Sequence, residues 1–535
     1  MQSLLDYNAK TTTYGYDELN RLQTKTPDAY FTPRGDAQVS FTYTATGKRQ
    51  SMTDASGTTI YTYDSMDRLK TKQTPQGTLT YSYDAVGNLT SMVSSNVNGI
   101  SVSYIYDELN RLKTVVDNRQ PSGQNTTAYG YDPVNNLVTV TYPNGVQSSF
   151  VYDDLNRLTN MPVQKASTIA NYSYQLGATG NRNSATEQAN GTTRNVNWTY
   201  DNIYRLTNES MSGATPNGSV AYGLDAVGNR LSQTSSLSGI SSGTFTFDAN
   251  DRLSSEQYDL NGNTTVTGAR AFTYDFENRA RTMTMGTTTV TLQYDGDGNR
   301  VAKNIGSTTT RYLVDDLNPT GYPQVVEEVV NGAVQRTYTY GLQRISQYQP
   351  INSTWTASFY GYDGMGSVRL LTNAAGAVTD RYDYDAWGNS VNVTGTTPNV
   401  YLYRGEQYDP DLTLYYLRAR YSNPLTGRFI TRDPAAGSIK DVRTFHKYLY
   451  SSGDPVNRID PTGRVDLIEN FIVQSRFSLF TKEILLATYK AAQVHCAAVT
   501  IVNITTKPFT GGLVPWYVEY PCDIIGGVLL WDLAK

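Results

Sequence analysis

Cysteine and histidine are almost absent from this chain of 535 residues, which contains two of each. They are Cys496, Cys522, His446 and His495, so a site with several Cys or His metal ligands is nearly excluded over most of the chain. A disulfide framework is excluded as well, because the two cysteines form one bridge at most or remain reduced and buried. We therefore expect no metal and no cofactor.

The chain also lacks an excess of positive charge and any long apolar run. Its formal net charge is −4 and its pI is about 5.4, so no basic field points to nucleic acid or an anionic membrane as a partner. No stretch reaches the roughly 18 apolar residues that a membrane span needs. Residues 1–22 lack the regions of a signal peptide and enter a repeat almost at once, so we expect the chain to begin inside a longer protein.

Tyrosine, by contrast, is unusually frequent. The chain has 43 tyrosines against 14 phenylalanines, and its 43 glycines are accompanied by many Thr, Ser and Asn residues. A compact helical core does not have this composition. It is typical of a long protein rich in strands and turns, and we therefore predict an all-β fold.

The tyrosines belong to a short repeat phrase: an aromatic residue, any residue, a second aromatic residue and Asp, then two variable residues, then Gly, Asn or Asp followed by Asn, Arg or Leu. "YSYDAVGNL" at 81–89 and "YIYDELNRL" at 104–112 are two copies. Successive copies lie about 20–27 residues apart, a spacing typical of solenoid and propeller-like arrays. Degenerate copies lie near Thr44 and Gln175, and the clear ones are centred on Asp17, Asp64, Asp84, Asp107, Asp132, Asp153, Asp201, Asp225, Asp248, Asp275 and Asp295.

Each copy is expected to form about one β-hairpin. Aromatic residues at positions i and i+2, such as Tyr81 and Tyr83, fall on one face of a strand. Asp is a poor strand former whose carboxylate accepts hydrogen bonds from nearby N–H groups, so it ends the strand. Gly87-Asn88 then tolerate the positive φ of a tight turn. Because a lone hairpin is marginal in water, neighbouring copies must stack.

Two interpretations of the tyrosine–aspartate pairs are open. An aromatic face beside a carboxylate suits a pyranose ring, so the pairs could bind sugars. They can equally be scaffold, in which tyrosine packs one side of the sheet and Asp pairs with the following Arg or caps the turn. We favour scaffold, because so many equivalent positions would hardly all be ligand pockets.

The copies "YDELNRL", "YDAVGNL" and "YDGDGNR" resemble the YD repeats of bacterial Rhs proteins, of insecticidal toxin-complex components and of the teneurin shell. The resemblance spans residues 10–463 and implies hairpins that wind spirally into a hollow barrel or cocoon. On this basis we divide the chain into a YD-repeat β-shell (1–355), an Rhs-associated core domain that plugs the shell (356–463) and a variable C-terminal segment (464–535) that is α or α+β.

The core-domain assignment rests on "YYLRARYSNPLTGRFITRDP" at 415–434 and "DPVNRIDPTG" at 454–463. In many members of the family this domain cuts its own backbone just after the D-P-x-G motif, with a pair of aspartates. The resemblance gives these roles to Asp433 and Asp460, with the cut at Gly463–Arg464 or one residue later. The pair suits the reaction, because one carboxyl stays protonated as the acid while the other activates water.

Arg432, next to Asp433, could hold one carboxylate ionised or polarise the scissile carbonyl. Two features depart from the family pattern: Asp454-Pro455 stands where Asn-Pro is usual, and Arg464 follows D-P-x-G where an apolar residue is usual. The same dipeptides also favour simple turns without any chemistry. The sequence thus predicts a self-cleaving protease of the aspartic type, with an inert plug as the alternative.

Residues 464–535 carry neither the repeat phrase nor its tyrosines. In Rhs-like proteins this position holds variable cargo, often a toxin, but no activity can be assigned to it here. His495 and Cys496 could be half of a nucleophilic or metal site, although we favour an amphipathic helix that ends in ordinary core residues.

The function predicted from the resemblance is a polymorphic toxin shell that encapsulates its own C-terminal effector segment. Its expected partners are that segment as cargo, a secretion-system component and an immunity protein. The protein itself is expected outside the cell or on the cell surface. The alternative is an extracellular or cell-wall-associated protein that binds a surface glycan or a protein partner through the repeats.

Overall fold

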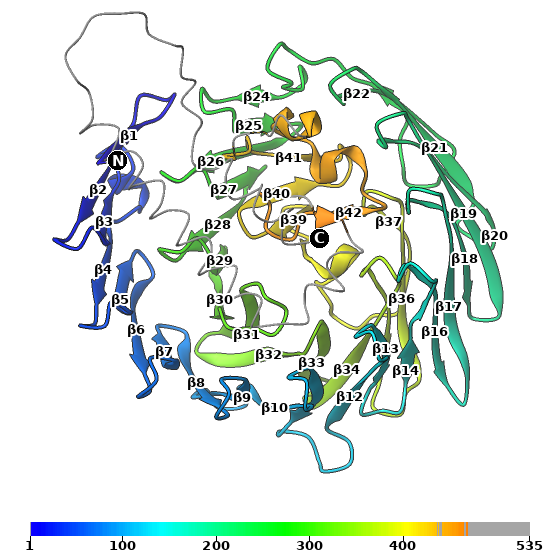
Figure 1. Cartoon of the computed structure of the whole chain (residues 1–535). Helices are drawn as coiled ribbons and strands as arrows, with labels where there is room; N and C mark the ends of the chain where they lie inside the picture. Colours follow the sequence, from blue (N-terminus) through cyan, green and yellow to red (C-terminus); the bar gives the residue numbers. More distant parts are fainter. Residues whose placement is uncertain (1, 436, 438–440, 465–466, 469–535) are drawn as a thin grey trace, which may run out of the picture.

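The computed structural model describes residues 2–435, 437, 441–464 and 467–468. Most of the predicted C-terminal segment, including His495, Cys496 and Cys522, lies outside the described residues. Two long antiparallel sheets follow one another along the chain, and the first curls around the outside of the second (Figure 1). We call them the outer and the inner sheet.

The outer sheet has 23 strands. Each strand pairs antiparallel with the next along the chain, except that β14 and β15 both pair with β16. The strands are β1 (Ser3–Leu5), β2 (Thr11–Tyr16), β3 (Leu22–Thr26), β4 (Val39–Tyr43), β5 (Arg49–Asp54), β6 (Gly57–Tyr63), β7 (Leu69–Thr74), β8 (Gly77–Tyr83), β9 (Leu89–Ser94), β10 (Ser101–Tyr106), β11 (Leu112–Asp117), β12 (Thr126–Tyr131), β13 (Leu137–Thr141), β14 (Gln147–Ser149), β15 (Val151–Tyr152), β16 (Leu158–Lys165), β17 (Ser167–Leu176), β18 (Arg182–Ala189), β19 (Thr192–Tyr200), β20 (Leu206–Gly213), β21 (Gly218–Leu224), β22 (Arg230–Ser235) and β23 (Gly243–Thr244).

The inner sheet has 14 strands, again paired in chain order. They are β24 (Gln257–Tyr258), β25 (Thr264–Thr267), β26 (Arg270–Tyr274), β27 (Ala280–Met285), β28 (Thr288–Tyr294), β29 (Arg300–Ile305), β30 (Thr308–Asp315), β31 (Gln324–Val330), β32 (Ala333–Tyr340), β33 (Arg344–Ile351), β34 (Thr354–Tyr362), β35 (Val368–Thr372), β36 (Val378–Tyr384) and β37 (Ser390–Thr394). The predicted domain boundary at 355/356 falls inside β34, so the inner sheet is built from both predicted domains.

The remaining described elements form a closing segment, the described residues of 395–468, that lies inside the curve of the inner sheet (yellow to orange in Figure 1). It contains a four-stranded sheet and a two-stranded sheet. Its elements are η2 (Tyr403–Gly405), β38 (Gln407–Asp409), β39 (Leu414–Leu417), β40 (Arg420–Asn423), β41 (Arg428–Phe429), η3 (Val442–Phe445), η4 (Tyr450–Gly453), β42 (Arg458–Ile459) and β43 (Leu467–Ile468); a further 3-10 turn, η1 (Thr32–Arg34), follows β3.

The main hydrophobic core lies between the two sheets. Leu79 and Met92 of the outer sheet and Leu313 and Leu371 of the inner sheet are fully buried in one cluster. The strands alternate buried and exposed residues, as in β8, because successive side chains point to opposite faces. The helices among the described residues are short 3-10 turns. The prediction of an all-β shell is thus confirmed.

The repeat phrase forms a strand end and a tight turn, as predicted. In the copy at 81–89 the pairing with the next strand shifts at Tyr83, which marks a β-bulge. The backbone N–H of Asp84 then donates to the carbonyl of Asn88 at 3.0 Å, and Gly87 has a φ of +100°. Glycine or asparagine is favoured at this turn position because both tolerate the left-handed region.

The Asp of the phrase fastens its own turn. One Asp64 carboxylate oxygen accepts hydrogen bonds from the backbone N–H groups of Met66 and Arg68, at 2.9 and 3.0 Å, and the other accepts from the Arg68 side chain at 2.7 Å. The Arg68 guanidinium also donates to the carbonyl of Asp84 in the next copy at 2.8 Å. This Asp–Arg pair therefore bridges two neighbouring turns.

The second tyrosine of the phrase fastens each copy to the one before it. The Tyr83 hydroxyl donates to the carbonyl of Leu69 at 2.7 Å, and the Arg68 guanidinium lies 4.7 Å from the Tyr83 ring centroid. This requirement for a hydroxyl explains why tyrosine outnumbers phenylalanine. The same bond to the preceding hairpin is made by Tyr43, Tyr63, Tyr131, Tyr152, Tyr200, Tyr274, Tyr294, Tyr340, Tyr362 and Tyr384.

Candidate functional site

The D-P-T-G turn at residues 460–463 docks on the tight turn between β39 and β40. Three successive carbonyls of this turn accept hydrogen bonds from three successive residues of the sequence R-A-R. The Arg418 side chain donates to the Pro461 carbonyl, the Ala419 backbone N–H donates to the Thr462 carbonyl at 3.2 Å, and the Arg420 side chain donates to the Gly463 carbonyl. The backbone before the candidate cleavage site is thus held carbonyl by carbonyl.

Gly463 fits this contact because it has no side chain. Its φ is +70°, and a Cβ atom there would lie 2.5 Å from the Leu417 carbonyl oxygen and 2.9 Å from the Arg420 backbone nitrogen. Another residue would have to adopt a disfavoured conformation and push the two segments apart.

The Arg420 guanidinium joins the two predicted aspartates. Its Nη2 lies 2.8 Å from Oδ2 of Asp433 and 3.4 Å from Oδ2 of Asp460, while its Nε donates to the Gly463 carbonyl. The structure therefore brings Asp433, Asp460 and Gly463 together around one cation. The guanidinium carbon also lies 3.6 Å from the Phe429 ring centroid, and this stacking fixes the plane of the group.

The residue after the turn is also in contact with an aspartate. The backbone N–H of Arg464 donates to Oδ1 of Asp460 at 3.0 Å and to the Thr462 hydroxyl oxygen at 3.2 Å. Asp460 is 2% exposed. Of the two peptide bonds predicted for cleavage, the Gly463–Arg464 bond therefore has Arg420 on its carbonyl oxygen and Asp460 on its nitrogen.

Arg432 lies apart from this arrangement. It is exposed, and its guanidinium carbon lies 5.4 Å from the Tyr7 ring centroid. Arg420 occupies the position that our sequence analysis gave to Arg432, beside the carboxylates and the carbonyl. Proximity in sequence to Asp433 favoured Arg432, whereas the signal for Arg420 was its place in the R-A-R-Y stretch that carries the family resemblance.

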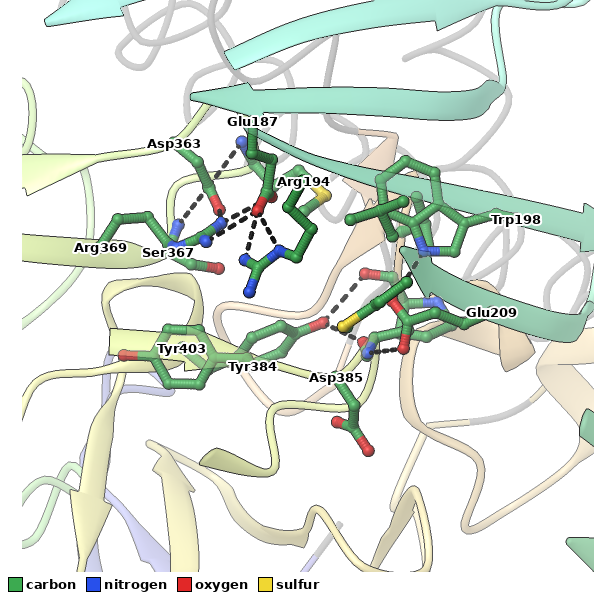
Figure 2. Close-up of a pocket in the computed structure, with 16 residues that line it drawn as sticks. Glu187, Arg194, Trp198, Glu209, Asp363, Ser367, Arg369, Tyr384, Asp385 and Tyr403 are labelled. Carbon is green, nitrogen blue, oxygen red and sulfur yellow. Dashed lines mark hydrogen bonds and ion pairs between the residues drawn. The ribbon is translucent and has the colours of Figure 1, made fainter. Parts of the chain in front are cut away.

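A second group of charged residues lies buried between the two sheets (Figure 2). Glu187 of β18 forms ion pairs with Arg194 of β19 and with Arg369 of β35, the latter at 2.8 Å. Burial raises the pKa of Glu187, but Arg369 and Arg194 outweigh it and lower the pKa to about 2. The cavity among these side chains is about 20 Å³, room for one water molecule. This cluster therefore joins the sheets and does not form a substrate pocket.

Glu209 borders the same cavity (Figure 2). Its carboxylate accepts hydrogen bonds from the Trp198 indole N–H at 2.9 Å and from the Ala386 backbone N–H at 2.8 Å. Burial and the neighbouring Asp385 raise the pKa of Glu209 above its ordinary value. The bond from Ala386 ties β20 of the outer sheet to the turn after β36 of the inner sheet, while the bond from Trp198 joins β20 to β19.

Within the described ranges, no group of three or more His, Cys, Asp or Glu side chains is arranged to hold a metal ion. The described helices include none that is long and apolar enough to cross a membrane.

Comparisons with known proteins agree with this fold. The teneurin YD-shell family model matches residues 34–235. The tRNA3(Ser)-specific nuclease WapA of Bacillus spizizenii is 34% identical over 214 residues, which cover 38% of this chain and 9% of that protein. The tRNA nuclease WapA of Bacillus subtilis is 33% identical over 214 residues, with the same coverage of both proteins.

Among solved structures, the TcdB2–TccC3 complex matches with a TM-score of 0.71 at 15% identity, over 86% of this chain and 27% of that chain. At this identity the likeness establishes the shell fold alone. The matches span about 9% of the length of these curated relatives.

Proposed function

We propose that this chain, which is a YD-repeat shell protein of the Rhs type, forms the shell of a polymorphic toxin, encloses its own C-terminal segment and cuts the backbone between Gly463 and Arg464. The observation that carries the proposed cleavage is the position of Arg420, which contacts the Gly463 carbonyl and both Asp433 and Asp460.

The proposed reaction is hydrolysis. Asp433 takes a proton from a water molecule, whose oxygen bonds to the Gly463 carbonyl carbon. The Arg420 guanidinium stabilises the negative charge that develops on the carbonyl oxygen. Asp460 donates its proton to the Arg464 nitrogen as the C–N bond breaks. The products are a carboxyl group on Gly463 and an amine on Arg464, and exchange with solvent restores the protonation states of the two aspartates.

The buried position of Asp460 supports its role as the acid. A buried carboxyl group in contact with the leaving nitrogen is well placed to transfer a proton to it. Asp433 is more exposed than Asp460, so it is the better placed of the two to meet a water molecule and act as the base.

Encapsulation would follow from the continuous sheet. The outer and inner sheets bury a common core, and within the inner sheet the strands pair in chain order, so they would form a continuous wall around the cargo. The cargo would be residues 464–535, and the shell would act outside the cell or at its surface; the similarity to two proteins named as tRNA nucleases supports a cargo with a destructive activity. A secretion-system component and an immunity protein remain predicted partners.

Self-cleavage is tested by intact mass and a denaturing gel. Wild-type chain should yield a fragment that begins at Arg464, whereas Asp433→Asn and Asp460→Asn should cut at least a hundredfold more slowly, since a general acid or base contributes about 10²–10⁴-fold. Arg420→Gln should behave like them, and Arg432→Gln is its matched control and should cut normally. A wild-type chain that keeps its full mass would refute the proposed protease.

Encapsulation has a separate test. Limited proteolysis of the folded chain should spare residues 469–535, and the same segment should be digested once the shell is opened with denaturant. Rapid digestion of this segment in the folded chain would contradict encapsulation whether or not the chain cuts itself.

The alternative, a carbohydrate-binding repeat surface, is not favoured by the tyrosines. The first tyrosine of the phrase is turned into the core, as at Tyr81 and Tyr104, which are 3% and 2% exposed. The second tyrosine uses its hydroxyl within the sheet. These contacts support the scaffold interpretation of the repeat phrase.

A further inference from the structure

We infer that β42 and β43 form a strand clip that holds the chain on both sides of the Gly463–Arg464 bond by backbone pairing, and so presents this bond to Arg420, Asp433 and Asp460 whatever side chains follow. The inference deepens the proposed self-cleavage and rests on it for its purpose. The existence of the clip can be tested without any cleavage.

The two strands lie on either side of the candidate cleavage site. β42 precedes the D-P-T-G turn and β43 follows it, and they pair antiparallel with Arg458 opposite Ile468 and Ile459 opposite Leu467. Leu467 and Ile468 of the predicted C-terminal segment are thus paired with β42, beyond Arg464. A strand pairing uses N–H and C=O groups that every residue except proline provides, so it makes no demand on side chains.

β42 is a firm support for the second strand. Asn457, just before it, accepts a hydrogen bond from the Arg182 backbone N–H at 2.8 Å and donates to the Tyr200 hydroxyl at 3.1 Å. The Arg458 backbone N–H donates to the Asp454 carbonyl at 3.1 Å. The clip is therefore attached to the turns of the outer sheet, and the bond between its strands takes its position from the shell.

The clip holds the amine side of the Gly463–Arg464 bond, whereas the R-A-R contacts hold its acyl side. Those contacts fix the carbonyls of residues 461–463, on the acyl side of the bond. On the amine side, Arg464 is held through its backbone N–H by Asp460 and Thr462. β43 adds an anchor further along the chain, so the leaving nitrogen is restrained from both directions. Such restraint raises the fraction of time that the bond spends in the reactive geometry.

The clip should also open after the Gly463–Arg464 bond has been cut. A ladder of two residue pairs is marginal, and it is favoured here because both strands belong to one chain and lie close together in sequence. Cleavage at Gly463–Arg464 removes that link, so the pairing becomes an association between separate chains and loses its effective concentration. The same reaction would thus cut the C-terminal segment and loosen its pairing with β42.

Proline substitutions test the clip. In an antiparallel pair, neighbouring residues alternate between pointing their N–H groups toward and away from the partner strand. Leu467→Pro and Ile468→Pro each remove one backbone N–H, and only one of these two groups points at β42. The variant that loses this N–H should slow cleavage at least fivefold in a cell-free synthesis time course, and the other variant should slow it less. Leu467→Thr and Ile468→Thr are the controls: they change the side chain, keep the N–H, and should cut at the wild-type rate.

Hydrogen exchange tests the clip in an uncut chain. In Asp460→Asn, one of the two amides at 467 and 468 should exchange at least tenfold more slowly than in an unfolded peptide, and the matching proline variant should lose the protection at the paired residues of β42. Exchange of both amides at the unfolded rate, or threonine variants that cut as slowly as the proline ones, would overturn the inference. An uncut wild type with protected amides would instead remove the proposed protease and leave the clip.

Discussion

The ion pairs between the two sheets should determine how the shell responds to acid, and Glu187→Gln is the sharpest perturbation of them. Glu187 belongs to the outer sheet, and Arg369, its partner, to the inner sheet. Glutamine has the shape of a protonated glutamate, so the substitution removes the charge and little else. Arg194 and Arg369 would keep Asp383 as a shared partner.

The size of the effect follows from the pKa of Glu187. Burial raises this pKa, but Arg369 and Arg194 lower it from 4.5 to about 2. A carboxyl group with a depressed pKa in the folded state stabilises the fold above its unfolded pKa, and this contribution is lost as the pH falls toward the folded pKa. A difference of this size corresponds to about 3 kcal/mol at pH 7 and about 1 kcal/mol at pH 3. Glu187→Gln should therefore cost about 3 kcal/mol at pH 7 and much less at pH 3.

Denaturant unfolding followed by tryptophan fluorescence is a suitable assay, because Trp198 lines the same buried cavity. The midpoint of the variant should fall well below that of the wild type at pH 7, and the two midpoints should converge at pH 3. Glu108→Gln, on an exposed turn, is the control and should change neither midpoint. A loss below about 1 kcal/mol at pH 7, or a gap that persists unchanged at pH 3, would refute the argument, because buried pairs of this kind cost about 3–5 kcal/mol to break.

Three further predictions concern the repeat, the closing segment and the turn. Tyr83→Phe should destabilise the shell by about 1 kcal/mol in the same unfolding assay, because it removes the hydrogen bond to the Leu69 carbonyl. Tyr104→Phe should be neutral or stabilising, because the buried Tyr104 hydroxyl has no hydrogen-bond partner among the described residues. Asp454→Asn should raise the thermal midpoint of the chain at pH 8 and not at pH 4. Burial raises the pKa of Asp454 from 3.8 to about 6. Ionisation of Asp454 therefore lowers the stability of the folded chain as the pH rises through this range, and the loss reaches about 3 kcal/mol at higher pH. Equal midpoints of this variant and the wild type at pH 8 would contradict that pKa. Gly463→Ala should slow self-cleavage at least tenfold by intact mass because its Cβ meets Leu417 and Arg420, while Gly191→Ala, at a φ of +71° with no atom within 4 Å, should cut normally.

The repeat phrase made most of the fold predictable from the sequence. Its spacing of aromatic residues, Asp and Gly-Asn gave the strand ends and turns, because these depend on neighbours within a few residues, and the copy number indicated a long all-β sheet. The partners across the two layers were not predictable in this way. Glu187 and Arg369 are 182 positions apart, and no periodicity links them.

The candidate site was partly predictable, but from the family resemblance and not from the repeat phrase. Asp433, Asp460 and Gly463 came from motifs of the family resemblance, and the structure brings them together. Arg420 was missed as the cation because adjacency in sequence pointed to Arg432, while the turn between β39 and β40 places Arg420 against the D-P-T-G segment from 40 positions away. A strand turn reverses the chain, so the side chain nearest in space is seldom the nearest in sequence.

The position of the site also links cleavage to the completeness of the shell. Asn457, which precedes β42, is bonded to Arg182 and Tyr200 of the outer sheet, and the Tyr448 hydroxyl donates to the Gly262 carbonyl near the start of the inner sheet at 2.8 Å. Both supports come from parts of the chain that must already be folded around the closing segment. A peptide bond aligned by such contacts reaches its reactive geometry only after both sheets have folded around the closing segment. The proposed cut would therefore be the last step of assembly, when the shell can already enclose the C-terminal segment.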